Sequence, residues 1–191
     1  MLRLRYDTPL AWSQMVLDNL DAFLQDHANN ERKVAQAALT MAAHNAQYPE
    51  IVDAMIELAH EELTHFSQVH DLLKKRGVGL GQDQPDPYMG PLHKLIRKGD
   101  RDAFLLDRLL VFGVVEARGC ERFRMVSEAL PEGDLKEFYL ELTRCEARHH
   151  GLFTRLARIW FDEDVVVKRL DEILEHEATV VRKLPLRPAL H

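Results

Sequence analysis

The chain has 191 residues, of which 46% are apolar and 29% are charged, and its formal net charge is −6. This length predicts a single domain over residues 1–191, with a core large enough to be stable without disulfide bonds. Two cysteines favour a reducing compartment, and the lack of a long apolar run predicts a cytoplasmic protein with no membrane partner. The acidic balance argues against a nucleic acid as the partner.

Apolar residues recur at helical spacing through most of the chain, and the alternation typical of strands is nearly absent. The expected helices, in chain order, cover residues 10–25, 29–45, 50–76, 102–130, 135–160 and 164–182. Asp134 is the expected N-cap of the helix that follows it. Residues 77–90 are rich in glycine and proline and are expected to form a long crossover. Two long helical hairpins joined by one crossover predict an all-α, ferritin-like four-helix bundle with additional short and terminal helices.

The motif Glu-x-x-His occurs three times, more often than random placement of the 16 Glu and 10 His residues predicts. A spacing of three puts both side chains on one helical face, so that each pair can hold one metal ion. The pair Glu57 and His60 shares its face with other polar residues and is expected to be exposed. Each of the four long helices turns an acid, or an acid and a histidine, toward its apolar face: Glu31; Glu62 and His65; Glu116; Glu146 and His149.

These six residues predict a dinuclear metal site. Four carboxylates buried together would repel one another, and each would carry a large desolvation cost, unless cations neutralise them or they take up protons. One Glu from each of two helices, with Glu-x-x-His from each of the other two, is the ligand set of carboxylate-bridged di-iron or di-manganese proteins. Oxygen-rich ligation with two imidazoles suits iron or manganese better than a structural zinc ion.

The cysteines and the other histidines have plainer interpretations. Cys120 and Cys145 face inward and are expected to be small buried core residues, although Cys120 lies one turn beyond Glu116 and could contact the metal site. The histidines expected at the surface are His27, His44, His60, His70, His93, His150 and His176.

Glu31 and the segments 59–66, 116–123 and 145–150 resemble the ligand-bearing helices of ferritin-like di-iron proteins. Over nearly its whole length, the chain resembles more closely the bacterial tRNA 2-methylthio-isopentenyl-adenosine hydroxylase family. That resemblance implies a di-iron monooxygenase that hydroxylates the isopentenyl side chain of a modified adenosine next to the anticodon in tRNA. It also implies two iron ions as the cofactor, with manganese as the alternative, and O2 and an external electron donor or reductase as partners.

The sequence around the predicted ligands also differs from related patterns. Glu146-x-Arg148-His149 is similar to the fourth-helix signature of di-iron monooxygenases, which puts Arg148, like Cys120, beside the expected centre. Cys120 stands where several bacterial monooxygenases have Thr, and Cys145 stands where larger di-iron enzymes often have Asp. The residue that delivers protons is therefore left open.

A tRNA partner requires a basic surface. The first candidate follows the crossover and consists of Lys94, Arg97, Lys98 and Arg101, and the second consists of Arg182, Lys183 and Arg187. For both clusters the alternative is an ordinary solvated face. If the four acidic ligands bind two divalent ions, the remaining surface is close to neutral and the overall acidity no longer argues against RNA.

Other ferritin-like roles remain open from the residues alone. Ferroxidase and iron storage, a peroxidase and a manganese catalase all use similar ligands. A helical interaction module without metal is the non-enzymatic alternative.

Overall fold

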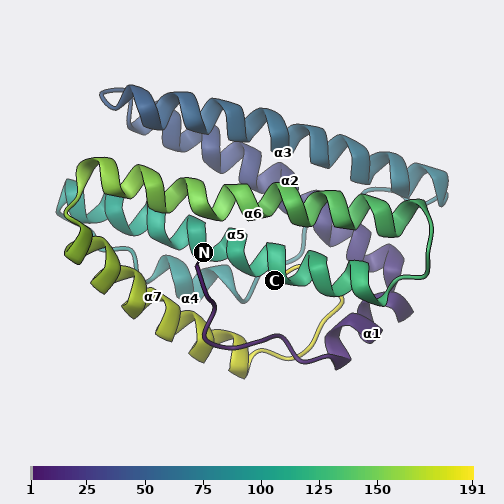
Figure 1. Ribbon diagram of the computed structural model, residues 1–191. Helices are drawn as coiled ribbons and strands as arrows, with labels where there is room; N and C mark the ends of the chain where they lie inside the picture. The colour runs from purple at the N-terminus through teal and green to yellow at the C-terminus, as the bar shows by residue number, and fades with distance from the viewer. Residues whose placement is uncertain (1) are drawn as a thin grey trace. The chain divides into compact units, whose positions relative to one another are not determined.

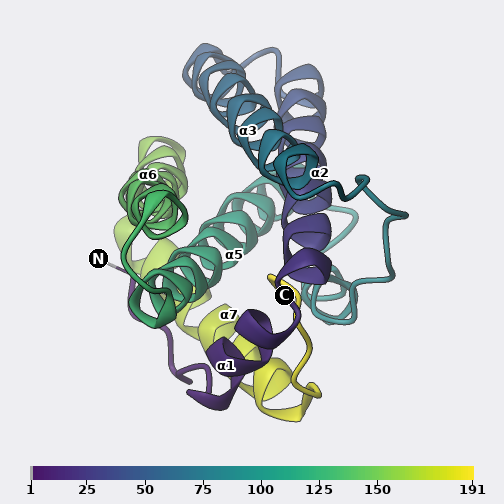
Figure 2. The same ribbon diagram turned by 90° about the vertical axis from the view of Figure 1, so that its right-hand side faces the viewer.

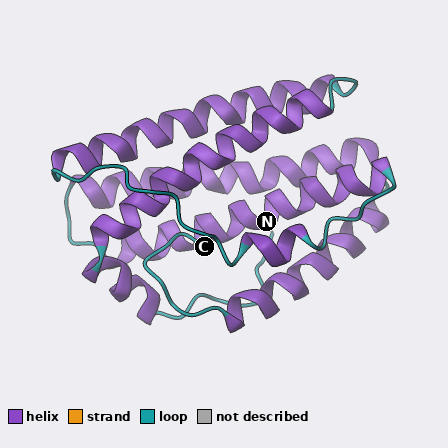
Figure 3. Cartoon of the chain, turned by 180° about the vertical axis from the view of Figure 1, so that it is seen from behind, coloured by secondary structure: helices purple, strands orange, loops and turns teal. Residues whose placement is uncertain are grey.

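The computed structural model describes residues 2–191, and of His150 only the backbone. Over these residues it contains seven helices and no strand (Figure 1, Figure 3). The helices are α1 (Ala11–Asp18), α2 (Leu20–His44), α3 (Pro49–Lys75), α4 (Met89–His93), α5 (Arg101–Ala129), α6 (Asp134–Trp160) and α7 (Glu163–Lys183). The predicted all-α class is confirmed. None of the described helices is long and apolar enough to cross a membrane.

The chain divides into two compact units, which are described separately below. One holds the residues up to Leu17, Asp86–Arg187 and His191, and the other holds Asp18–Pro85 and Pro188–Leu190. The first unit contains α1 and α4 to α7, and the second contains α2 and α3.

In the second unit, α2 and α3 pack side by side as an antiparallel hairpin (Figure 2). Pro49 starts α3, where its fixed backbone angle suits the first helical turn and its missing N–H leaves no bond unmade. Small residues such as Ala35 and Ala38 on α2, and larger ones such as Met55 and Leu58 on α3, are buried. The apolar faces anticipated from the sequence therefore form the core of this hairpin.

The break between α1 and α2 falls at Asn19, and the predicted break near residues 26–28 is wrong. Residues 26–30 are mostly polar, and the helix accommodates them through bonds to the preceding turn. The side-chain amides of Asn29 and Asn30 donate to the carbonyl oxygens of Gln25 and Asp26, each at 3.0 Å. Such local bonds let α2 run unbroken through its polar segment.

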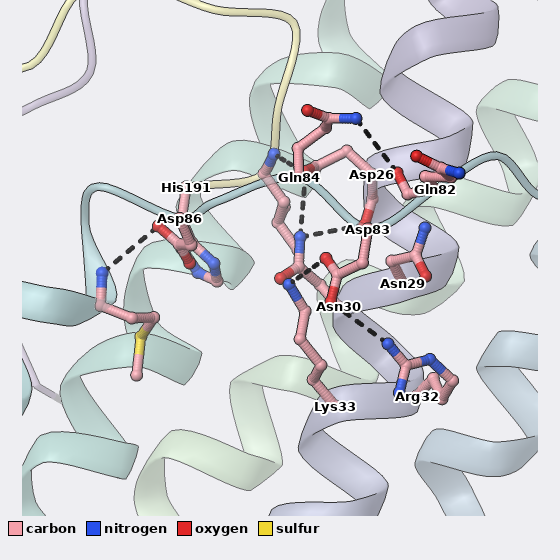
Figure 4. A network of polar contacts seen from close by, with 12 residues as sticks. Asp26, Asn29, Asn30, Arg32, Lys33, Gln82, Asp83, Gln84, Asp86 and His191 are labelled. Atoms are coloured by element: carbon pink, nitrogen blue, oxygen red, sulfur yellow. Dashed lines mark hydrogen bonds and ion pairs between the residues drawn. The ribbon is translucent and has the colours of Figure 1, made fainter.

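The crossover is tied to α2 by polar contacts (Figure 4). Asp83 pairs with Lys33 Nζ at 2.9 Å and with Arg32 Nη2 at 3.3 Å. Gln25 donates to the carbonyl oxygen of Gly79 at 2.7 Å. The first part of the crossover therefore lies along α2, in the same unit.

In the first unit, α5 and α6 form the second long hairpin, and α7 packs against α5. Asp100 caps α5 by accepting a bond from the Ala103 N–H at 2.7 Å. The prediction that Asp134 is the N-cap of α6 is wrong. Gly133 takes that place with φ of 147°, a conformation that favours glycine, and Asp134 is the first residue of the helix.

The short helix α4 begins at the end of the crossover, and none of the expected helix ranges covers it. Asp86 Oδ1 accepts bonds from the backbone N–H groups of Tyr88 at 2.8 Å and Met89 at 3.3 Å, which starts the helix (Figure 4). Tyr88 and Leu92 are fully buried in the first unit, so packing stabilises a helix of only five residues.

Candidate metal-binding residues

The α2–α3 hairpin brings together three of the predicted ligands. Glu31 on α2 and Glu62 and His65 on α3 are at most 8% exposed, and each offers one ligand atom within 4.8 Å of the others. His65 Nδ1 lies 3.4 Å from Glu62 Oε2 and 3.8 Å from Glu31 Oε2. The spacing of three on α3 puts Glu62 and His65 on the face that packs toward Glu31.

His27 joins this group, although the sequence analysis placed it at the surface. Its side chain is completely buried, and Nε2 lies 2.6 Å from Glu31 Oε1, one turn further along α2. The prediction of a surface position for His27 is wrong because it considered the residue alone. Its distance of four residues from Glu31 is the signal that could have identified it.

The α5–α6 hairpin brings together the other three predicted ligands. Glu116, Glu146 and His149 are at most 6% exposed, and one ligand atom of each lies within 4.8 Å of the others. His149 Nδ1 is 3.0 Å from Glu146 Oε2. Both hairpins thus carry the same donor set, two carboxylates and one imidazole.

The donor chemistry of both groups fits iron or manganese. Two carboxylates held close together in a buried site carry negative charge that a divalent cation offsets. Four oxygen-donor residues with two imidazoles and no thiolate suit these metals better than a structural zinc ion. We call these groups the first triad (Glu31, Glu62, His65) and the second triad (Glu116, Glu146, His149).

Cys145 and Arg148 lie beside the second triad. Cys145 Sγ is 3.8 Å from His149 Nε2, and Arg148 Nη2 donates to the same sulfur at 3.2 Å. Arg148 is itself exposed. The contact with Cys145 therefore links Arg148 indirectly to the imidazole of His149.

Cys120 is half-buried and donates its Sγ–H to the carbonyl oxygen of Thr143 at 3.4 Å. Burial, followed by the negative charge of Glu146, raises the pKa of the Cys120 thiol to about 11. In the metal-free protein Cys120 therefore stays protonated at neutral pH, which makes it a poor nucleophile.

The other histidines that were expected at the surface differ in their exposure. His44, His60 and His93 are exposed, as is Glu57 of the third Glu-x-x-His motif. His70 and His176 are half-buried. The side chain of His150 lies outside the described residues.

The residues of the first basic cluster are exposed, but Arg97 also pairs with a buried acid. Arg97 makes a two-armed pair with Asp107, through Nε at 2.9 Å and Nη2 at 2.8 Å. Asp107 is fully buried and also accepts a bond from Arg169 Nε at 2.7 Å. Arg97 thus serves the packing of the first unit, whereas Lys94, Lys98 and Arg101 are exposed residues of the same cluster.

Comparison with solved structures first identifies the class of protein. A protein described as "Protein 43 with aldehyde deformylating oxygenase activity from Synechococcus" superposes with a TM-score of 0.91 and 35% identity. The match covers 97% of this chain and 92% of that chain, and that protein has a ferritin-like fold. The ferritin-like class expected from the hairpin connectivity is therefore confirmed.

The sequence comparisons then identify the family. The chain belongs to the tRNA-(MS[2]IO[6]A)-hydroxylase (MiaE) family, whose family model matches residues 2–191. It is 34% identical to the tRNA 2-(methylsulfanyl)-N(6)-isopentenyladenosine(37) hydroxylase of Pseudomonas putida, over 92% of this chain and 84% of that protein. It is 35% identical to the Salmonella typhimurium hydroxylase of the same name, over 61% of this chain and 42% of that protein.

Proposed function

We propose that this protein is a di-iron monooxygenase that hydroxylates the isopentenyl side chain of 2-methylthio-isopentenyl-adenosine next to the anticodon in tRNA. The observation that carries the proposal is the pair of buried Glu/His triads in a chain of this family. The co-substrate is O2, and the electrons come from an external donor. A tRNA substrate places the enzyme in the cytoplasm.

We further infer that the two triads serve one dinuclear centre within a single ferritin-like domain over residues 1–191. The same three-residue donor set in each hairpin supports this inference, since each set suits one metal ion. Iron is the proposed metal and manganese the alternative. When bound, the iron pair supplies the activation of O2 that hydroxylation of an unactivated C–H bond requires.

The surrounding residues of this chain hold the ligands in place and exclude water. His27 contacts Glu31 and orients it, as partners of metal ligands commonly do. The rings of Phe112 and Phe153 lie 5.5 Å apart between α5 and α6, and Phe153 is fully buried. Such an apolar wall keeps bulk water from the oxidised carbon atom.

The direct test is nucleoside analysis by mass spectrometry. Isopentenylated tRNA is incubated with iron-loaded protein, O2 and a chemical reductant, and the modified adenosine is expected to gain one oxygen atom. Glu146→Gln is expected to abolish the product. Glu57→Gln is the matched control because it changes an exposed acid of the third Glu-x-x-His motif. An unchanged nucleoside with an intact iron centre would contradict the proposal.

The same preparation separates the alternatives. The structural relative described as having aldehyde deformylating oxygenase activity makes an aldehyde the rival substrate, and consumption of an aldehyde without tRNA oxidation would favour that activity. Ferroxidase and iron storage predict iron far in excess of two ions per chain. A manganese catalase would release O2 from peroxide, and a peroxidase would consume peroxide with an electron donor.

A further inference from the structure

A cavity of about 150 Å³ lies in the first unit, at the end of α7. Its walls come from the N-terminal segment, α1, α5, the end of α7 and the segment that follows α7. Its lining includes two aromatic residues, Tyr6 and Trp12, and three arginines, Arg122, Arg182 and Arg187. Arg182 is exposed, so the cavity reaches the surface.

The cavity is lined by three arginines and, among the described residues, by no acidic side chain. Arg122 is only 6% exposed, whereas Arg182 is exposed and Arg187 is half-buried. Burial and the nearby charge of Arg118 lower the pKa of Arg122 to about 10, so it remains a cation at neutral pH. A buried cation in a cavity lined by further cations favours an anionic ligand.

Glu121 and Glu177, two acids whose charges act on Arg122, are also engaged by another cation. Arg118, which does not line the cavity, donates from Nε to Glu177 Oε1 at 2.8 Å and from Nη2 to Glu177 Oε2 at 3.1 Å. It also bonds Glu121 through Nη1. Glu121 and Glu177 are thus shared with Arg118 and offset only part of the positive charge of the three arginines in the cavity wall.

Two of the arginines make cation–π contacts with aromatic rings. The Arg122 guanidinium lies over the Trp12 ring at 5.1 Å, and the Arg182 guanidinium lies over the Tyr6 ring at 5.2 Å. Stacking of this kind uses the flat face of a guanidinium group, whereas phosphate binding uses its N–H edge. The rings can therefore restrict both side chains without competing for the phosphate-binding edge.

We propose that this cavity binds a backbone phosphate of the RNA substrate, through Arg182, Arg187 and the buried Arg122. The assignment to RNA rests on the proposed function, whereas the assignment to a phosphate group rests on the cavity itself. The cavity is smaller than the 300–1,000 Å³ or so of typical small-molecule sites, which suits one phosphate group rather than a whole nucleotide. Paired guanidinium N–H groups match phosphate oxygens in geometry and charge.

The test measures tRNA binding against salt concentration for the full chain and for Arg182→Gln and Arg187→Gln. Each lost phosphate contact is expected to weaken binding about fivefold to tenfold and to reduce the slope of log K against log salt by roughly 0.7 to 0.9. Lys168→Gln is the matched control, because Lys168 is exposed on the same helix as Arg182, outside both basic clusters and absent from the cavity wall. Equal slopes in all four proteins, or an equal loss in Lys168→Gln, would overturn the proposal.

A second measurement separates the sources of phosphate. Inorganic phosphate is added at constant ionic strength, and the thermal unfolding of wild type and Arg182→Gln is followed. The proposal expects phosphate to stabilise only the wild type and to compete with tRNA. Phosphate binding without any effect on tRNA would assign the cavity to a free anion and overturn the RNA assignment. Loss of tRNA binding in the cavity variants, with no nucleoside oxidation by wild type, would instead reject only the proposed function.

Discussion

His27 Nε2 lies 2.6 Å from Glu31 Oε1, one turn apart on α2, and the His27 side chain is completely buried. The contact restricts the carboxylate of a proposed metal ligand from the side of its own helix. The imidazole also packs near the Phe23 ring, with the ring centroids 6.0 Å apart, and its contact with Glu31 can orient that carboxylate.

Replacing His27 is therefore expected to weaken metal binding. His27→Leu removes the bond to Glu31, and loss of such a partner typically costs about 10-fold to 100-fold in metal affinity. His27→Gln, which keeps a hydrogen-bonding group, should lose less. Iron titration measures the affinity, circular dichroism confirms folding, and the exposed His44 on the same helix supplies the control His44→Gln. Unchanged iron affinity in His27→Leu would refute the positioning role.

Glu62→Gln is expected to change stability in opposite directions with and without metal. Glu31 and Glu62 offer oxygens within 4.8 Å of each other in a buried site, so removing one charge relieves repulsion in the metal-free protein. We expect a gain of about 1 kcal/mol, or roughly 2–4 °C in Tm. In iron-loaded samples the variant should be less stable than wild type, because it binds the ion weakly.

Thermal unfolding with iron and with a chelator measures both effects. The exposed Glu57 on α3 provides the control Glu57→Gln, for which neither condition should change Tm. A chelator should lower the Tm of wild type. A Glu62→Gln protein that is less stable without metal would contradict the repulsion between the carboxylates.

Asp107 should make stability depend on acidity. Burial raises the pKa of this carboxyl, but hydrogen bonds from Arg97 and Arg169 outweigh burial and hold it below its usual value. The ionised Asp107 carboxylate therefore contributes its full stabilisation of the fold above the unfolded-state pKa of about 3.9. This stabilisation is lost as pH falls through the lower folded-state pKa. Urea unfolding of Asp107→Asn should show about 2–3 kcal/mol less stability near neutral pH and a flatter decline in acid. A parallel decline in both proteins would exclude Asp107 as the source.

The pair Arg118 and Glu177 is expected to dominate the polar core of the first unit. Both side chains are fully buried and the Arg118 Nε to Glu177 Oε1 distance is 2.8 Å. Arg118→Leu leaves the Glu177 carboxylate buried without its cation, which typically costs about 3–5 kcal/mol. Arg124→Leu on the same helix should change little, because Arg124 and its partner Glu128 are exposed. Denaturant unfolding compares the two variants, and equal effects would show that burial of the pair is not decisive.

The residues of the first basic cluster are expected to have two different roles, tRNA binding for the lysines and stabilisation of the fold for Arg97. Lys94→Gln and Lys98→Gln should weaken tRNA binding and reduce its salt dependence, because exposed lysines contact phosphates as mobile charges. Arg97→Gln should instead lower stability, since it breaks the two-armed contact with buried Asp107. Binding isotherms and urea unfolding on the same samples distinguish the two effects. An unchanged salt slope in the two lysine variants would remove this cluster from the RNA surface.

Helices and ligand pairs could be predicted from the sequence because both depend on local periodicity. Glu62 and His65, like Glu146 and His149, share a face by their spacing of three, whatever the helix packs against. Apolar residues at intervals of three and four mark the same faces as buried. The six ligand candidates, grouped by hairpin, follow from this local geometry. The family resemblance rests instead on the sequence segments around these residues, and the comparisons confirm it.

Only the tertiary structure decided how isolated polar residues are used. The roles of His27 and Arg97 depend on buried partners, Glu31 and Asp107. The spacing of four allows His27 to contact Glu31, but only the structure shows that both side chains are buried together. The cavity at the end of α7 combines segments that lie more than a hundred residues apart in the chain. The physical reason is that helical periodicity specifies which face is buried, whereas the pairing of charges depends on which segment covers that face.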